Sequence, residues 1–166
     1  MALVRASADK KTSKEVENFL NELLQHYPHQ IKHPVRWGDI DMLGHVNNTN
    51  YFRYCEEGRV NFFTDSQIRA ALGEDKLGFV VAYIDCKFKF PVTYPDNLIV
   101  ATKVEQISKD RFTLSQIIYS ENHQKVAAKS ESIIVSFSHE LQSKINLPSA
   151  ALTLLETELA RGGASI

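Results

Sequence analysis

Apolar residues recur at helical spacing near the start of the chain. They lie at Val16, Phe19, Leu20, Leu23, Leu24 and Tyr27. The segment before them, Thr12 to Glu15, has the form of a capping box. Pro28 predicts the end of the helix, because the residue before a proline disfavours helical backbone angles. One face of this helix is apolar, so we expect it to dock against the rest of the protein.

A longer helix is predicted from Asn47 to about Gln67. One of its faces carries Tyr51, Cys55, Gly58 and Phe62 at helical intervals, and Phe52 and Phe63 widen that face. A glycine inside a helix costs about 1 kcal/mol relative to alanine. Gly58 therefore predicts that another backbone approaches the helix closely.

Beyond Gly78 the apolar positions change to the period of strands. Residues 79–84 form a continuous apolar run, and residues 84–90 alternate between apolar and charged. Further alternating runs lie at 98–104, 112–119 and 126–139. The turns between them are short, which forces antiparallel pairing. The charged positions share one face, as in a sheet with one side in water.

Prolines mark two further elements. A short strand at residues 31–37 contains Pro34, which favours the edge of a sheet or a bulge. Pro148 opens a final helix that ends near residues 161–163. The strands must bury an apolar face, and the long helix is the only large apolar object available. The order of elements therefore predicts an α+β domain, in which one curved antiparallel sheet wraps around a long central helix.

The chain has 166 residues, a length that suits one compact domain. We divide it into a flexible leader at 1–11, an N-terminal helical extension at 12–30, a main domain at 31–140, and a C-terminal helix and tail at 141–166.

Composition narrows the possible functions and locations. The formal net charge is -1, so no global field attracts nucleic acid or a membrane surface. No apolar run approaches the roughly 20 residues that span a bilayer. We interpret Cys55 and Cys86 as buried free thiols in a reducing compartment, which predicts a cytoplasmic location. The lack of acidic residues before Asp9 resembles a transit peptide, so import into an organelle stays an alternative. No cofactor is predicted.

The most informative segment is the loop from Trp37 to Tyr51. A calcium loop is excluded, because its fifth position would be Leu43 and its twelfth Asn50. His45 with two aspartates is too small a set to predict a transition-metal site. The same residues are also ordinary in turns, and Asn47 is a good helix N-cap. A purely structural loop is therefore one interpretation.

Acyl transfer is the other interpretation of this loop. The start of the predicted helix offers unpaired backbone amides and the positive end of the helix dipole, which stabilise a developing oxyanion. The first turn, Asn48 to Asn50, holds no acid that would neutralise it. Asp41 lies a few residues upstream, where it could act as a base or nucleophile. Gly44 would let the backbone pass close to a ligand.

Residues 39–51 spell Asp-x-Asp-x-x-Gly-His-Val-Asn-Asn-x-x-Tyr. This run resembles the signature of the 4-hydroxybenzoyl-CoA-thioesterase-like branch of the hotdog superfamily. The similarity continues along the helix to Arg59, and with the strand order it covers residues 31–140. The resemblance implies a hotdog fold, with the sheet wrapped around residues 47–67. It also implies hydrolysis of an acyl-CoA thioester to the free acid and CoA.

The resemblance further implies roles for particular residues. Asp41 is expected to be the catalytic carboxylate, and the backbone N–H near Asn48 to polarise the thioester carbonyl. His45, Asn47 and Tyr51 are the expected substrate-binding residues. A homodimer or homotetramer is implied, with acyl-CoA bound where two subunits meet.

Two other functions stay open. Hotdog dehydratases pair a histidine with an acid, so His45 and Asp41 would suit an enoyl-CoA hydratase or dehydratase, but the wider dehydratase patterns are absent. The protein could also bind acyl-CoA or a partner without turnover. The acyl group is undefined, because four phenylalanines fit a pocket or the core equally: Phe62, Phe63, Phe79 and Phe88. Candidates for binding the CoA phosphates are Lys87, Lys89, Lys103, Lys109 and Arg111.

Overall fold

The computed structural model describes residues 13–72 and 77–163. The expected leader at 1–11 and Thr12 of the capping box lie outside these ranges. The helices are α1 (Ser13–Gln25), α2 (Asn48–Asp65) and α3 (Ser149–Arg161), with short 3-10 turns at Trp37–Asp39 and Ala70–Leu72. The strands are β1 (His29–Pro34), β2 (Leu77–Ile84), β3 (Lys87–Phe88), β4 (Asn97–Ile107), β5 (Arg111–Ser120), β6 (Lys125–Ser138) and β7 (Ser143–Lys144).

The strands form one sheet in the order β1-β4-β5-β6-β2, and β3 and β7 add short pairings to β6. Each of these pairings is antiparallel. β1 is an edge strand and contains Pro34, as the sequence predicts. Irregular register at three of the pairings accompanies the strong curl of the sheet.

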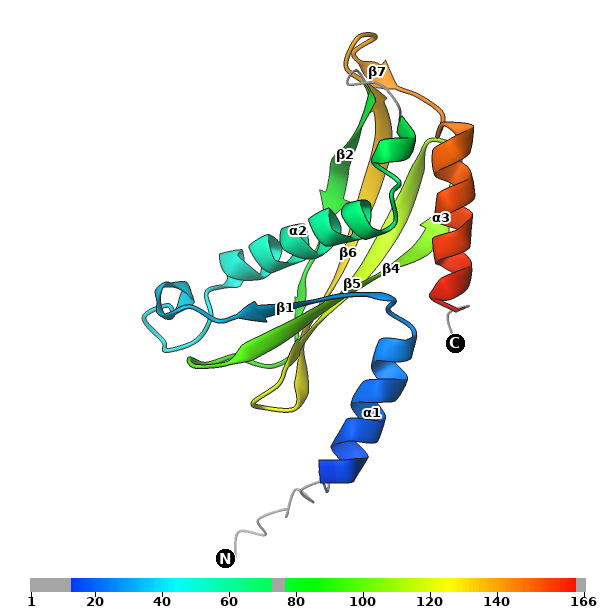
Figure 1. Cartoon of the computed structure of the whole chain (residues 1–166). Coiled ribbons are helices and arrows are strands. Elements are labelled where there is room, and N and C mark those ends of the chain that lie inside the picture. The colour runs from blue at the N-terminus through cyan, green and yellow to red at the C-terminus, as the bar shows by residue number, and fades with distance from the viewer. Residues whose placement is uncertain (1–12, 73–76, 164–166) are drawn as a thin grey trace, which may run out of the picture.

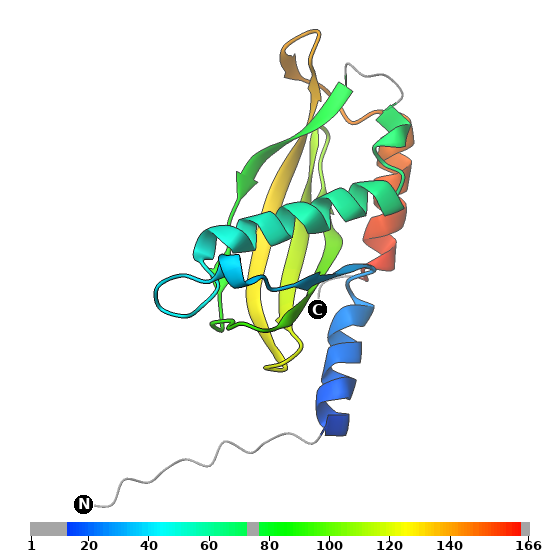
Figure 2. The same ribbon diagram turned by 60° about the vertical axis from the view of Figure 1, so that its left-hand side comes forward.

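Helix α2 lies across the hollow of this curled sheet (Figures 1 and 2). The side chains that it buries there include Tyr51, Tyr54, Cys55 and Phe62. Gly58 allows the helix to lie close to the sheet, because a Cβ atom at this position would meet Gln116 Nε2 at 2.6 Å and Val100 Cγ1 at 2.8 Å. The expected close approach is therefore present, although the nearest atoms belong to side chains of β4 and β5 rather than to a backbone.

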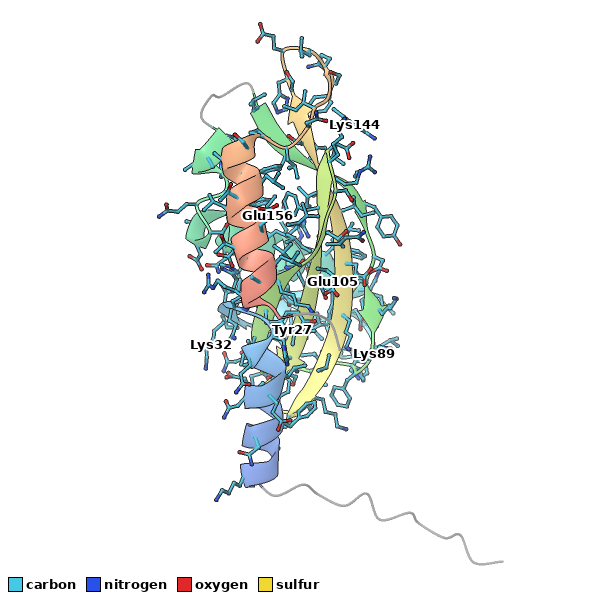
Figure 3. The ribbon with its side chains drawn as sticks, turned by 90° about the vertical axis from the view of Figure 1, so that its right-hand side faces the viewer. Tyr27, Lys32, Lys89, Glu105, Lys144 and Glu156 are labelled. Carbon is cyan, nitrogen blue, oxygen red and sulfur yellow. The ribbon has the colours of Figure 1, made fainter. Side chains whose placement is uncertain are left out.

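The other face of the sheet carries α1. Leu20, Leu23 and Leu24 pack against a buried cluster that includes Tyr27, Ile99, Ala101, Ile117 and Tyr119. The predicted docking of the first helix is confirmed. α3 begins after Pro148 and packs Ala151 and Leu155 against the core beside the end of α2. Figure 3 shows α1 and α3 one below the other along the same side of the sheet.

Two strand predictions need correction. The first strand spans His29–Pro34, and Trp37 belongs to a 3-10 turn. The run 84–90 is no continuous strand, because the backbone N–H groups of Lys89 and Phe90 both donate to the carbonyl of Ala127 and end the ladder after β3. The apolar run 79–84 is only partly covered by its own chain, with Val80, Val81 and Tyr83 exposed by 41%, 42% and 52%.

The cysteines also differ from each other. Both are free thiols, and Cys55 is fully buried as predicted, whereas Cys86 is only partly buried. No helix among the described residues has the length and apolar character needed to cross a membrane.

Candidate active site

The loop between the 3-10 turn and α2 is closed on itself by backbone hydrogen bonds. Ile40 and Val46 form an isolated antiparallel bridge, and the N–H of Asp41 donates to the carbonyl of His45 at 2.8 Å. The N–H of Gly44 returns to the carbonyl of Asp41 at 3.0 Å, which requires a φ of +78° at this glycine. Gly44 therefore provides the tight turn that places Asp41 and His45 side by side.

The Asp41 carboxylate is oriented by the same loop. Its Oδ1 accepts hydrogen bonds from the backbone N–H of Leu43 at 2.8 Å and of His45 at 3.4 Å. No hydrogen bond reaches Oδ2 from the residues that the structure describes, and the side chain is partly exposed. One oxygen is thus held by the backbone, while the other is available to a ligand.

Asp39 has a different role, although it belongs to the same motif. Its Oδ2 accepts from the backbone N–H of Arg36 and from the hydroxyl of Tyr54, both at 2.8 Å. Its carbonyl accepts from the backbone N–H of Asn47 at 2.8 Å and from the amide of Asn50 at 3.0 Å. These hydrogen bonds attach the loop to the first turns of α2. The role of Asp39 is therefore structural, because its carboxylate and its carbonyl both hold the loop in place.

The N-terminus of α2 faces this loop. Asn47 is the N-cap, and its Oδ1 accepts from the backbone N–H of Thr49 at 3.0 Å and from the Thr49 hydroxyl at 2.8 Å. Asn48 is the first helical residue, whose N–H has no acceptor within the helix. The first turn carries no acidic residue. The Asn48 amide, which has no hydrogen-bond acceptor among the described residues, therefore lies at the positive end of the helix dipole.

A cavity of about 350 Å³ joins the loop, the helix start and the segment after β3. It is lined by Asp41, His45, Val46, Asn48, Tyr51, Phe88, Lys89, Phe90 and Pro91. The structure thus brings together four of the five predicted site residues. The fifth, Asn47, does not line this cavity, because its side chain caps the helix.

The wall opposite the helix comes from a distant part of the sequence. In the sequence, Phe88 was one of several phenylalanines that fit a pocket or the core, and Lys89 was one of several candidates for binding the CoA phosphates. The sequence analysis did not identify Phe90 and Pro91 as site residues. The ring of Phe88 meets the ring of Tyr51 at 5.1 Å between centroids. Burial raises the pKa of Tyr51, so this phenol stays neutral at physiological pH. Lys89 is exposed (Figure 3). It also lines the cavity, where it adds a positive charge.

A larger cavity of about 800 Å³ lies at the opposite end of α2. Its walls include Phe63 and Phe79, whose rings are stacked at 5.4 Å, together with Arg69 and His139. It contains none of the residues of the motif at 39–51. We therefore assign the candidate active site to the smaller cavity, where the carboxylate and the helix terminus converge.

Sequence comparisons relate this chain to known thioesterases. A family model described as the Thioesterase-like superfamily matches residues 35–155. FadM, a long-chain acyl-CoA thioesterase of Escherichia coli, is 30% identical over 99 residues, which are 60% of this chain and 74% of FadM. The acyl-CoA thioesterase YbgC of Helicobacter pylori is 33% identical over 86 residues, which are 51% of this chain and 62% of YbgC.

The solved structures agree on the fold. The structure of a 1,4-dihydroxy-2-naphthoyl-CoA thioesterase from Synechocystis superposes with a TM-score of 0.67 at 18% identity, over 76% of this chain and 94% of that protein. A likeness at this identity concerns the fold alone. The family model covers most of the chain, including the loop, α2 and the whole sheet from β2 to β6. The chain therefore belongs to the Thioesterase-like superfamily and has the hotdog fold that the resemblance implied.

Proposed function

We propose that this protein hydrolyses the thioester of an acyl-CoA, with Asp41 as the general base or nucleophile and the N–H of Asn48 as the oxyanion donor. One observation carries this proposal. A carboxylate with one oxygen free and the unpaired N-terminus of α2 line the same cavity. Membership of a thioesterase family and relatives named as acyl-CoA thioesterases agree with it.

The chemistry follows from these two groups. As a base, Asp41 takes a proton from a water molecule while the water oxygen attacks the thioester carbonyl. As a nucleophile, its carboxylate attacks the carbonyl itself, and water then cleaves the resulting anhydride. In both cases the carbonyl oxygen gains negative charge and accepts a hydrogen bond from Asn48 N–H. The carbon–sulfur bond breaks, and CoA leaves as a thiol after protonation.

The remaining walls suit the substrate. The rings of Tyr51, Phe88 and Phe90 provide apolar surface, and Lys89 provides a cation for a phosphate of CoA. His45 and Tyr51 are proposed to contact the substrate directly. Asn47 is proposed to act indirectly. Its side chain caps the helix and so fixes the orientation of the Asn48 amide.

We also propose that two copies share the site, in a dimer or in a tetramer built from such dimers. β2 pairs with β6 on one side only, and its sequence LGFVVAYI contains neither a charge nor a proline. Natural edge strands are usually protected by such residues, as β1 is by Pro34. An unprotected apolar edge fits pairing with the same strand of a second copy around a two-fold axis.

The test is the release of thiol from a panel of acyl-CoAs with short, medium, long and aromatic acyl groups. Wild-type protein should hydrolyse at least one of them, and Asp41→Asn should remove most of that rate. Binding of acyl-CoA with no thiol release would make the protein a binding module instead. Loss of the conjugated double bond of an enoyl-CoA, at a higher kcat/KM than hydrolysis, would make it a hydratase.

A further inference from the structure

Helix α2 has two sides with different neighbours. On one side, Glu57 bonds His33 of β1 at 2.7 Å, and Asp65 lies 3.7 Å from His29 of the same strand. On the other side, Ser130 of β6 is a neighbour that lowers the pKa of the Cys55 thiol against the larger effect of burial. The ring of Phe63 stacks on Phe79 of β2.

Arg59 lies midway between Cys55 and Phe63, at the four-residue spacing that places all three on one side of the helix. Arg59 therefore faces the part of the sheet that ends in the open edge strand β2. The side chain belongs to neither of the two cavities described above.

Arg59 is buried without a counterpart among the described residues. The residue is only 9% exposed, and its Nη1 has no hydrogen-bond partner among the described residues. No described acid forms an ion pair with it. Burial lowers the pKa of Arg59, which is the mark of a desolvated guanidinium. Buried arginines are almost always paired, so the small part of this residue that remains accessible is open to an acceptor from outside the described residues.

Glu56 is the complementary group. It is exposed on α2, three residues before Arg59, and its charge favours the protonated guanidinium, yet the two side chains do not pair within the chain. The adjacent Glu57 differs, because His33 already occupies its carboxylate. Val60, one residue beyond Arg59, is an exposed apolar side chain, at 59%. A charge of each sign and an apolar contact thus lie within about one turn of each other.

The geometry points to a reciprocal ion pair, in which Arg59 of each copy donates to the Glu56 carboxylate of a second copy of this chain. This inference rests on the two-copy assembly proposed above. Pairing of β2 with its copy around a two-fold axis perpendicular to the sheet keeps both α2 helices on the same face and runs them in opposite directions. The middle of α2 falls between Glu56 and Glu57. With the two-fold axis placed beside the middle of α2, antiparallel helices lying side by side bring each Arg59 within about one turn of the other Glu56.

The test is a double-mutant cycle on the dissociation constant of the dimer, measured by analytical ultracentrifugation of the full chain. Glu56→Gln and Arg59→Met should each weaken the dimer by about tenfold or more, and the double variant should be no weaker than Arg59→Met alone. Glu57→Gln is the matched control and should leave the dissociation constant unchanged. Circular dichroism tests whether each variant is folded. If Arg59→Met does not fold, the test rests on the exposed residue Glu56, where Glu56→Gln and Glu56→Arg should both weaken the dimer.

Three results would overturn the pair: a monomeric wild-type protein, an unchanged dimer in Glu56→Gln, or additive effects in the cycle. Thiol release by the wild-type protein is recorded separately, so that the two proposals can fail independently. Hydrolysis without coupling between the two positions would refute the proposed ion pair and support the thioesterase proposal. Coupling without hydrolysis would support the ion pair and refute the thioesterase proposal.

Discussion

The hydroxyl of Tyr54 donates a hydrogen bond to Oδ2 of Asp39 at 2.8 Å, across the gap between the second turn of α2 and the loop that presents Asp41. Tyr54 is almost fully buried. Burial and the negative charge of Asp39 both raise the pKa of Tyr54, so the phenol remains a donor over the whole physiological range. The position of the proposed catalytic carboxylate therefore depends on a bond between two residues that do not line the cavity.

Tyr54→Phe should weaken both the fold and the activity. The variant loses a hydrogen bond to a charged acceptor, worth roughly 1.5–3 kcal/mol of the free energy of unfolding. The loop is then held less firmly, and kcat should fall by about tenfold. Urea unfolding and thiol release measure the two effects. Tyr119→Phe is the control, because the Tyr119 hydroxyl is buried without a hydrogen-bond partner among the described residues. Its removal should be neutral or stabilising, and equal losses in both variants would refute the role of the Tyr54–Asp39 bond.

Substitution of the two aspartates of the motif should have clearly different effects on the rate of hydrolysis. Asp41→Asn keeps an oxygen that can accept from Leu43 N–H, so the melting temperature should hardly change. The rate should nevertheless fall by about a hundredfold or more, because the base or nucleophile is lost. Asp39→Asn keeps an oxygen for Tyr54 and should lose less than about tenfold. Near-normal turnover in Asp41→Asn would show that another group performs the catalysis.

Gly58→Ala should destabilise the protein despite the better helix propensity of alanine. The new Cβ would meet Gln116 Nε2 at 2.6 Å and Val100 Cγ1 at 2.8 Å, and Gln116 is itself fixed by a bond to the carbonyl of Cys55. Overpacking of this kind costs about 1–3 kcal/mol, which exceeds the gain of about 1 kcal/mol in propensity. Gly38→Ala has nothing within 4 Å of its new Cβ and should stay within about 0.5 kcal/mol of wild type in the same urea titration.

Both cysteines should resist alkylation in the folded protein. Burial raises the pKa of Cys86 from an ordinary 9.0 to about 12, and it also raises the pKa of Cys55. Because the thiolate is the reactive form, labelling of the partly exposed Cys86 by iodoacetamide should be slow at pH 8 and accelerate about tenfold per pH unit above it. Unfolding in guanidinium should restore ordinary rates at both positions, and rapid labelling of native protein at pH 8 would contradict the prediction.

The raised thiol pKa values also set the sign of a stability effect. The folded state holds these protons more tightly than the unfolded state, so the contribution is complete below the ordinary pKa of 9.0. It is lost progressively as the pH rises from there towards the folded-state value. The free energy of unfolding should therefore decline above about pH 9, and Cys86→Ser should reduce the slope of that decline.

Local signals in the sequence predicted α2 and half of the site. The helix was expected from Asn47 to about Gln67 and spans Asn48–Asp65, because the cap and the apolar face are both local features. Its end was placed two residues late, since Ser66 turns back to bond the carbonyl of Phe62 with its side chain. Asp41, His45, Asn48 and Tyr51 were found together because one continuous motif carries them.

The rest depended on features that a single sequence does not contain. Phe90 and Pro91 reach the cavity because β3 pairs with β6, and this register cannot be read from alternation alone. The strand expected at 84–90 is interrupted because Asp85 bonds Glu131 with both its backbone and its side chain. Val81 and Tyr83 had the pattern of buried residues, yet what covers them belongs to another molecule in the assembly that we propose.

The outer face of the sheet is closed by the protein's own first helix. Ile99, Ala101, Ile117 and Tyr119 would form an apolar patch in water if α1 did not cover them. Only three residues separate Gln25, the last of α1, from His29, the first of β1. So short a connection gives α1 a local concentration at this patch in the millimolar range. Another molecule at micromolar concentration must compete with that tether, so α1 keeps this patch on the back of the sheet from becoming a contact surface, while the β2 edge stays open to association.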